Sequence, residues 1–214
     1  MNSVAILCNG AFPTEPYPLY LLDNADAVVC CDGALTHFLE RYGDSRMPAA
    51  VIGDMDSLPD GLQEKYAPLM VRVAEQDHND QTKAMRYVLD TWPDVTDIWI
   101  LGATGLREDH TIGNLGLLME YTRMFRLGDI RVSAVSDYGT AFAITDSCDL
   151  HLGEGRRISI FSADNSLRIS SEGLEWPLDN VVFDAWWKAT LNRTTAPIVS
   201  LHFSHPSSAL IIVD

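Results

Sequence analysis

Short apolar runs alternate with amphipathic helical patterns through residues 1–138, and this alternation limits the possible folds more than any other feature. Apolar residues recur at helical spacing within residues 35–42, 84–91 and 115–122. The strand-like runs between these helical patterns are Val4–Cys8, Ala27–Cys31, Ala49–Ile52, Leu69–Val73, Ile98–Leu101 and Ile130–Val135. Such alternation predicts an α/β domain with a mostly parallel, Rossmann-like sheet covered by helices.

The pattern changes after Asp137-Tyr138-Gly139, where short runs with period-two alternation are separated by turn residues. One weak helical candidate remains, at Val181–Trp187. The expected strands are Ala141–Thr145, His151–Leu152, Arg157–Ser162, Leu167–Ser170, Ile198–Phe203 and Leu210–Val213. We therefore expect an all-β, sandwich-like second domain over residues 139–214, following an α/β domain over residues 1–138.

The charge balance excludes some classes of partner. With 30 acidic and 15 basic residues, the net charge is −15, which disfavours duplex nucleic acid and anionic lipid surfaces. No apolar run reaches the roughly 18 residues of a membrane span. The first residues carry no basic segment typical of a signal peptide. The cysteines lack C-x-x-C spacing, so we expect reduced thiols in a cytoplasmic protein: Cys8, Cys30, Cys31 and Cys148.

Two carboxylates, Asp54 and Asp56, lie one residue apart directly after the apolar run Ala49–Ile52. Ionised carboxylates next to a buried strand need a partner. A divalent cation is the simplest partner for two of them, and hard oxygen ligands suit Mg²⁺. The pair therefore indicates a magnesium site, which usually accompanies a substrate that carries phosphate.

Four further polar clusters also follow expected strands. They begin with Asn9-Gly10, with Asp32-Gly33, with the acidic stretch from Glu75 to Asp80, and with the loop from Gly102 to Asp109. Ligands of open α/β sheets bind beyond the carboxyl ends of the strands. The sequence thus predicts that all five clusters converge on one edge of the sheet.

Asp80 has two possible roles, because it stands immediately before the helical pattern of residues 81–91. It could be a ligand, or it could be an ordinary N-cap. Lys83 lies three residues later, where a cation is poorly placed for the helix dipole. This position suggests that Lys83 neutralises a bound anion or the neighbouring carboxylates.

The segment Gly102–His110 is a glycine-containing turn between a strand and a helix. Backbone N–H groups in such turns suit phosphate, and Arg107 adds a guanidinium that can bind it through two hydrogen bonds. His110 could act as a general base, although a lone histidine at a helix start is more often structural. Asn114, one turn later, could close the same site.

Taken in order, these motifs resemble those of the thiamine pyrophosphokinase family. Residues Gly53–Ser57 are similar to its Gly-Asp-aromatic-Asp-Ser motif, and Asp32-Gly33 to its first Asp-Gly turn. The stretch Gln76–Ala84 resembles its acidic segment that ends in Lys-Ala, and Gly102–Asn114 resembles its Gly-Ala-x-Gly-Gly-Arg-x-Asp-His-x-x-x-Asn. Gly173–Leu178 resembles its Gly-Leu-x-Trp-Pro-Leu.

The resemblance implies transfer of pyrophosphate from ATP to thiamine, which gives thiamine diphosphate and AMP, in a homodimer with sites at the subunit interface. It implies a Mg²⁺ site formed by Asp54, Asp56 and Asp80, with Arg107 on phosphate and Asp109 at the reacting end. Trp176 would stack on thiamine. The remaining implied contacts to substrates are Asp32, Gln76, Asp77, Lys83, His110, Asn114 and Asn192.

Two departures from the family pattern concern the acceptor and the phosphate loop. Leu106 replaces the second glycine of Gly-Gly-Arg, and Leu191-Asn192-Arg193 stands where the family has Ser-Asn-Glu. A neighbouring hydroxyl, from Thr190 or Thr194, could replace the missing serine, or the acceptor could differ.

Two other functions fit part of the pattern. The run Asp54-Met55-Asp56-Ser57 is similar in shape to the Asp-x-Asp-x-Ser/Thr motif of phosphatases and phosphotransferases with an aspartyl nucleophile, but in that class the motif follows the first strand, whereas here the run follows the third. A protein that binds thiamine or a nucleotide without turnover is the other alternative. Against it, idle buried carboxylates would cost stability.

Overall fold

The computed structural model describes residues 2–214, and the chain divides into two compact units. The first unit comprises the residues up to Asn114 together with Gly128–Asp137. The second comprises Leu115–Leu127 and Tyr138–Asp214. Helix α5 (Glu108–Met124) therefore contributes to both units, whereas the predicted boundary at residue 138 assigned it wholly to the first.

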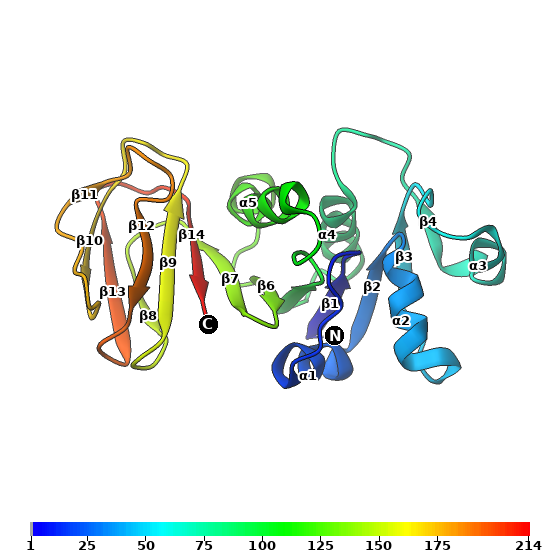
Figure 1. The fold of residues 1–214 in the computed structure, drawn as a ribbon. Helices are drawn as coiled ribbons and strands as arrows, with labels where there is room; N and C mark the ends of the chain where they lie inside the picture. Colours follow the sequence, from blue (N-terminus) through cyan, green and yellow to red (C-terminus); the bar gives the residue numbers. More distant parts are fainter. Residues whose placement is uncertain (1) are drawn as a thin grey trace. The chain divides into compact units, whose positions relative to one another are not determined.

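The first unit contains a parallel sheet of six strands in the order β6-β5-β1-β2-β3-β4 (Figure 1). Every neighbouring pair in this order runs parallel. The strands are β1 (Ser3–Leu7), β2 (Ala27–Cys31), β3 (Ala50–Gly53), β4 (Met70–Arg72), β5 (Asp97–Leu101) and β6 (Arg131–Ser136).

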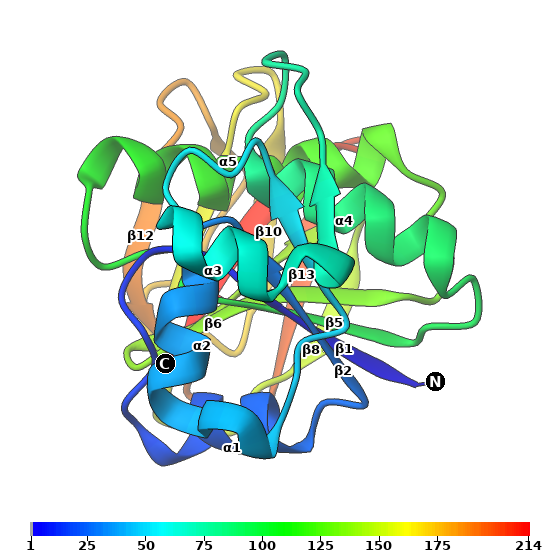
Figure 2. The ribbon, with the colours of Figure 1, turned by 90° about the vertical axis from the view of Figure 1, so that its right-hand side faces the viewer.

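Helices cover both faces of this sheet (Figure 2). Helices α1 (Pro16–Asn24) and α2 (Ala34–Tyr42) connect β1 to β2 and β2 to β3, whereas α4 (Asp80–Thr91) connects β4 to β5. From β1 the chain adds β2, β3 and β4 on one side of the sheet, and it then crosses back to add β5 and β6 on the other side of β1. Right-handed crossovers made in opposite directions place their helices on opposite faces. Short helical segments lie between these elements: Gly43–Ser45, α3 (Asp60–Lys65) and Ala67–Leu69.

Coverage on both faces explains why the central strands are apolar throughout. All five residues of β2 are buried. On one face Val28 and Cys30 pack with Leu22 of α1 and Phe38 of α2. Continuous apolar strands of this kind are typical of parallel sheets with helices on both sides.

The direction in which the strands are added reverses between β1 and β5, which are neighbours in the sheet. In doubly wound sheets the loops diverge at such a position and leave a crevice beyond the carboxyl ends of the strands. The fold therefore places the segments that follow β1 and β5 at a ligand-binding position.

The second unit contains two antiparallel sheets, in the orders β12-β9-β14-β7 and β11-β10-β13-β8. Inward-facing residues of both sheets form one core, which includes Ile158, Ile160, Ile169, Leu201 and Ile211. The strands are β7 (Gly139–Ile144), β8 (Cys148–His151), β9 (Arg157–Ser162), β10 (Arg168–Glu172), β11 (Val181–Val182), β12 (Ala189–Arg193), β13 (Ile198–Phe203) and β14 (Ala209–Val213).

The predicted fold class is confirmed: a mostly parallel sheet with helices, and an antiparallel sandwich. The helix suggested at Val181–Trp187 is wrong. Val181 and Val182 form β11, which pairs with Ile169 and Arg168 of β10, and Phe183 enters the sandwich core. Long-range strand pairing here outweighs a short local helical pattern. Among residues 2–214, no helix is both long and apolar enough to cross a bilayer.

Phe38 provides a test of the packing between α2 and the sheet. It is fully buried and packs against the Tyr42 ring, with ring centroids 4.7 Å apart and ring planes tilted by 43°. We expect Phe38→Ala to lower the free energy of unfolding by about 3–5 kcal/mol, measured by urea denaturation, because it leaves a cavity. Tyr17→Ala on α1, where the side chain is 59% exposed, is the control and should change this energy by under about 0.5 kcal/mol. Equal effects would contradict the assigned packing.

Candidate active site

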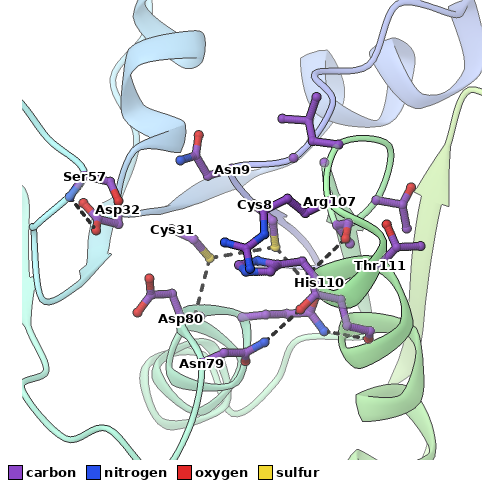
Figure 3. A pocket seen from close by; sticks show the side chains of 17 residues that line it. Cys8, Asn9, Cys31, Asp32, Ser57, Asn79, Asp80, Arg107, His110 and Thr111 are labelled. Carbon is purple, nitrogen blue, oxygen red and sulfur yellow. Dashed lines mark hydrogen bonds between the residues drawn. The ribbon is translucent and has the colours of Figure 1, made fainter.

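A cavity of about 370 Å³ lies beyond the carboxyl ends of the first unit's central strands (Figure 3). Its walls come from the segments after β1, β2 and β5 and from the first turns of α4 and α5. The residues that line it include Cys8, Asn9, Cys31, Asp32, Ser57, Asn79, Asp80, Gln81, Arg107, His110 and Asn114. The cavity therefore lies at the crevice that the strand order predicts.

Three carboxylates, Asp32, Asp54 and Asp56, bring oxygen atoms within 4.8 Å of one another, and we call them the acidic cluster. Asp32 follows β2, whereas Asp54 and Asp56 follow β3, the next strand in the sheet. The set differs from the predicted metal ligands Asp54, Asp56 and Asp80, because Asp32 completes the cluster.

Asp32 is the most buried member of the acidic cluster, with an exposed fraction of 3%. Its Oδ2 accepts a hydrogen bond from the backbone N–H of Ser57 at 3.2 Å. Its Oδ1 is buried without a hydrogen-bond partner among the described residues. Burial raises the pKa of Asp32 to about 6. A buried carboxylate oxygen without a donor is the arrangement that a cation would satisfy.

Gly53 permits the close approach of the strand ends. A Cβ atom at residue 53 would lie 2.9 Å from Cβ of Asp32 and 3.4 Å from Cγ of Asp80. Any side chain there would thus push Asp32 and Asp80 apart. The backbone of Asp32 itself has φ of 40°, a left-handed conformation that Asp and Asn tolerate better than most residues.

Met55 anchors the loop that carries Asp54 and Asp56. Its side chain is buried in the core beside α2, and its φ is 71°. With Met55 turned inward, the carboxylates on either side turn toward the cluster. Nε2 of Gln76 donates to Oδ2 of Asp54 at 3.1 Å. That hydrogen bond is the main reason why the pKa of Asp54 is lowered.

Asp80 lies in the first turn of α4, but it is not the N-cap. The N-cap is Asn79, whose side chain accepts from the backbone N–H of Thr82 at 3.0 Å. Burial raises the pKa of Asp80, while Nζ of Lys83, 3.3 Å from Oδ1, opposes that shift. The Lys83 side chain is buried. Its amine therefore neutralises a carboxylate at the edge of the cluster, one of the two roles expected from its position.

Arg107 and Asp109 pair with each other at the start of α5. Nη2 of Arg107 lies 2.5 Å from Oδ2 of Asp109, and both side chains are largely exposed. The guanidinium lowers the pKa of Asp109 to about 2. Arg107 lines the cavity. The pair keeps a cation at the cavity wall while holding Asp109 ionised.

Asn114 connects α5 with the two elements beside it. Its Nδ2 donates to the carbonyl of Ala103 at 2.8 Å, and its Oδ1 accepts from Nδ2 of Asn79 at 2.8 Å. Nε2 of Gln81 donates to the Asn114 carbonyl at 3.1 Å. These bonds fix the glycine loop against α4, which is a positioning role. His110 lines the same cavity from α5.

The turn before α4 is organised by Glu75, which the sequence did not single out as a site residue. Its carboxylate accepts from the backbone N–H groups of Asp77 and His78, at 2.8 and 3.1 Å, and lies 3.2 Å from the His78 ring nitrogen. Asp77 is exposed, and its backbone N–H donates to the Glu75 carboxylate. The sequence signal for this turn would be an acidic residue five positions before the helix start, whose carboxylate accepts from the backbone N–H groups two and three residues on.

Trp176 and Asn192 meet within the second unit. The carboxamide of Asn192 accepts from the Trp176 backbone N–H at 3.2 Å and donates to the Trp176 carbonyl at 2.7 Å. Trp176 itself is 58% exposed. Asn192 therefore holds the segment that presents the indole ring, and its own side chain is buried.

The departure at residues 191–193 has a distinct local structure. Leu191 is 84% exposed with φ of 60°, next to an irregularity in the pairing of β12 with β9. Nε of Arg193 lies 3.7 Å from Oε2 of Glu175. Thr194 is buried and donates to the Gly153 carbonyl at 2.7 Å. Of the two hydroxyls considered as replacements for the family's serine, Thr194 is thus committed to the fold, whereas Thr190 is half-buried.

Two of the cysteines, which the sequence analysis expected to be reduced thiols, also line the cavity. Sγ of Cys8 lies 4.0 Å from Sγ of Cys31. All four cysteines are free thiols in the structure.

The site combines an acidic cluster, whose member Asp32 lines the cavity together with Arg107, with the switch point of a doubly wound sheet. Such an arrangement is typical of proteins that bind phosphate-containing ligands. Residues 19–127 match the family model described as "Thiamin pyrophosphokinase, catalytic domain", and residues 139–210 match "Thiamin pyrophosphokinase, substrate-binding domain". The chain belongs to the thiamin pyrophosphokinase family.

Known relatives agree with this assignment. Thiamine pyrophosphokinase 1 of Oryza sativa subsp. japonica is 27% identical over 186 residues, which cover 75% of this chain and 68% of that protein. The thiamin pyrophosphokinase of Geobacillus thermodenitrificans has a similar structure, with a TM-score of 0.76, 21% identity, and coverage of 99% of this chain and 97% of that one. The thiamin pyrophosphokinase of Candida albicans is also similar in structure, with a TM-score of 0.80 and 15% identity. That match covers 99% of this chain and 88% of that one.

The raised pKa of Asp32 gives a pH-dependent prediction. The folded pKa of about 6 exceeds the ordinary 3.8, so folding favours the protonated form, and stability falls as pH rises between these values. We expect Asp32→Asn, without divalent cations, to raise the free energy of unfolding at pH 8 by roughly 1–2 kcal/mol. The gain should disappear near pH 4. Urea denaturation across this range measures it, and a gain that is independent of pH would contradict the assignment.

Proposed function

We propose that this protein is a thiamine pyrophosphokinase, which transfers the terminal pyrophosphate of ATP to the hydroxyl of thiamine and releases AMP. One observation carries the proposal: in a chain of this family, Asp32, Asp54 and Asp56 converge beside the switch-point cavity that Arg107 also lines. Neither the phosphatase alternative nor the alternative without turnover has a comparable observation in its favour.

In this proposal the triphosphate of ATP occupies the cavity. Asp32, Asp54 and Asp56 would hold Mg²⁺, and the unpartnered Oδ1 of Asp32 supports that role. When bound, Mg²⁺ supplies neutralisation of phosphate charge. The N–H groups at the start of α5 and Arg107 then bind phosphate oxygens, and the phosphate competes with Asp109 for the guanidinium.

The attacking hydroxyl needs a carboxylate to orient it or to accept its proton. Asp80 suits this role better than Asp109. Burial raises the pKa of Asp80, whereas Arg107 lowers that of Asp109 to about 2, which makes Asp109 a weak base. Lys83 keeps Asp80 in place beside Gly53. Gln76 orients Asp54, and Asn114 fixes the glycine loop.

The second unit would bind thiamine, a flat cation that suits an aromatic face on an acidic protein. Trp176 is the proposed stacking residue, and Asn192 holds its backbone. We include in the proposal a homodimer with interface active sites, because an interface would cover part of the exposed apolar surface of this unit, which comprises Trp176, Trp186, Trp187 and Leu191. A cytoplasmic location is consistent with the four free cysteines.

The direct test is to incubate the protein with ATP, Mg²⁺ and thiamine and to measure thiamine diphosphate and AMP by chromatography. We expect both products in equal amounts. Asp54→Asn/Asp56→Asn should lower turnover by at least about 100-fold, because the removed charges can no longer hold a cation against the phosphates. Asp149→Asn, a carboxylate of the second unit that bonds Ser200, is the matched control. Product formation retained in the double variant would overturn the metal-site assignment.

The stacking role of Trp176 makes a separate prediction. Trp176→Ala should raise KM for thiamine by about tenfold while KM for ATP stays unchanged, because loss of an aromatic face costs about 1–2 kcal/mol of cation binding. Tyr138→Ala removes another exposed aromatic side chain from the same unit, outside the surface assigned to the interface, and is the control. The steady-state kinetics of both variants, with each substrate varied in turn, measure this. A change in KM for ATP alone would contradict the role.

A further inference from the structure

Cys8 and Cys31 lie side by side at the floor of the cavity (Figure 3). Strands β1 and β2 are parallel neighbours in which Leu7 pairs with Cys30. One residue further along, Cys8 lies beside Cys31, and their sulfur atoms are 4.0 Å apart. Side chains of paired residues project from the same face of a sheet. Both thiols therefore face the cavity together.

The backbone geometry permits a bond between them. Neighbouring strands are spaced by about 4.8 Å, which falls within the Cα separation of about 4.4–6.8 Å that disulfides span. The sulfur atoms already face each other, so side-chain rotation brings them together with only a small adjustment of the strand ends.

The adjacent cysteine is a natural contrast. Cys30 projects from the opposite face of β2 and packs in the core with Leu35 and Phe38. Cys148 belongs to the second unit. Of the four cysteines, all within the described residues, Cys8 and Cys31 are the two that line the cavity.

We propose that Cys8 and Cys31 form a dithiol that a small peroxide oxidises reversibly to a disulfide at the floor of the nucleotide cavity. In the first step a thiolate attacks a peroxide oxygen, the O–O bond breaks, and a sulfenic acid and one water form. In the second step the other thiol attacks the sulfenic sulfur and expels a second water. Hydrogen peroxide thus accepts the two electrons, and the two thiols lose their hydrogens.

The order of the two steps follows from the surroundings of the thiols. Cys8 is the more exposed of the pair, at 7% against 3%. Because a peroxide reaches the thiols from the cavity, Cys8 is the residue that attacks peroxide and Cys31 is the one that resolves the sulfenic acid.

Disulfide formation would disturb the proposed active site, and this step rests on the proposed function. Asn9 and Asp32 directly follow the two cysteines. The Cys31 thiol also gives up its hydrogen bond to the Asp80 carbonyl, at 3.5 Å, and Cys8 gives up its bond to Oε1 of Gln81, at 3.8 Å. Drawing the sulfurs together therefore shifts Asp32 relative to Asp54 and Asp56. Displacement of catalytic groups by about 1 Å can lower turnover up to about 100-fold.

The experiment treats the reduced, full-length protein with hydrogen peroxide, blocks the remaining thiols by alkylation, and maps disulfides by peptide mass spectrometry. We expect a Cys8–Cys31 bond, a fall in turnover of about tenfold, and recovery of both on reduction with dithiothreitol. Cys30→Ala and Cys148→Ser should keep the bond and the relative loss of turnover. In Cys8→Ala and Cys31→Ala no reversible loss should occur, whatever their turnover before treatment.

A bond that involves Cys30 or Cys148, or irreversible oxidation without any disulfide, would overturn the proposal. A Cys8–Cys31 bond that leaves turnover unchanged would overturn its effect on the site. If the reduced protein makes no thiamine diphosphate at all, the proposed function fails, yet the peptide map still decides whether the thiol pair exists.

Discussion

Mutual repulsion among the carboxylates at the ends of β2 and β3 is the constraint on which the site depends. Asp32, Asp54 and Asp56 would separate in a flexible chain, because like charges at close range disfavour one another. The fold holds them together through backbone geometry: left-handed conformations at Asp32 and Met55, and a glycine at residue 53. Met55 couples that geometry to the core. The free energy of core packing thus maintains a strained, charged arrangement, as is common at functional sites.

The features that the sequence predicted correctly are those that depend on the local pattern of apolar and polar residues. Apolar strands such as Ala27–Cys31 are buried on both faces, so they identify a parallel sheet, and the polar residues after them identify its functional edge. What it could not predict depends on distant partners. The convergence of the polar clusters was predicted, but the pairing of β2 with β3 decides that Asp32, rather than Asp80, completes the set with Asp54 and Asp56. Val181 is a strand residue because β10 lies beside it. The Cys8–Cys31 contact likewise requires the register of two strands.

Asn114 and Asn192 show how buried carboxamides position their neighbours. Each donates to a backbone carbonyl on another segment, Asn114 to Ala103 and Asn192 to Trp176. Asn114 thus fixes the glycine loop, and Asn192 holds the segment that presents the Trp176 indole. A carboxamide has two N–H donors and an oxygen with two lone pairs, so these bonds leave capacity for a ligand. The substrate contacts that the family pattern implies for both residues stay predictions.

The acidic cluster and the thiol pair are joined through the backbone, because Cys31 directly precedes Asp32. Oxidation of the thiols can therefore change the geometry of the carboxylates. Residue 31 carries a thiol, and residue 32 carries the most buried carboxylate of the cluster, in a left-handed conformation that allows little adjustment. Close-packed interiors pass small displacements on to neighbouring groups rather than absorbing them. A contraction at the cavity floor must then appear at Asp32, whose free oxygen faces the proposed cation site. The same crowding that assembles this site would make it sensitive to oxidation.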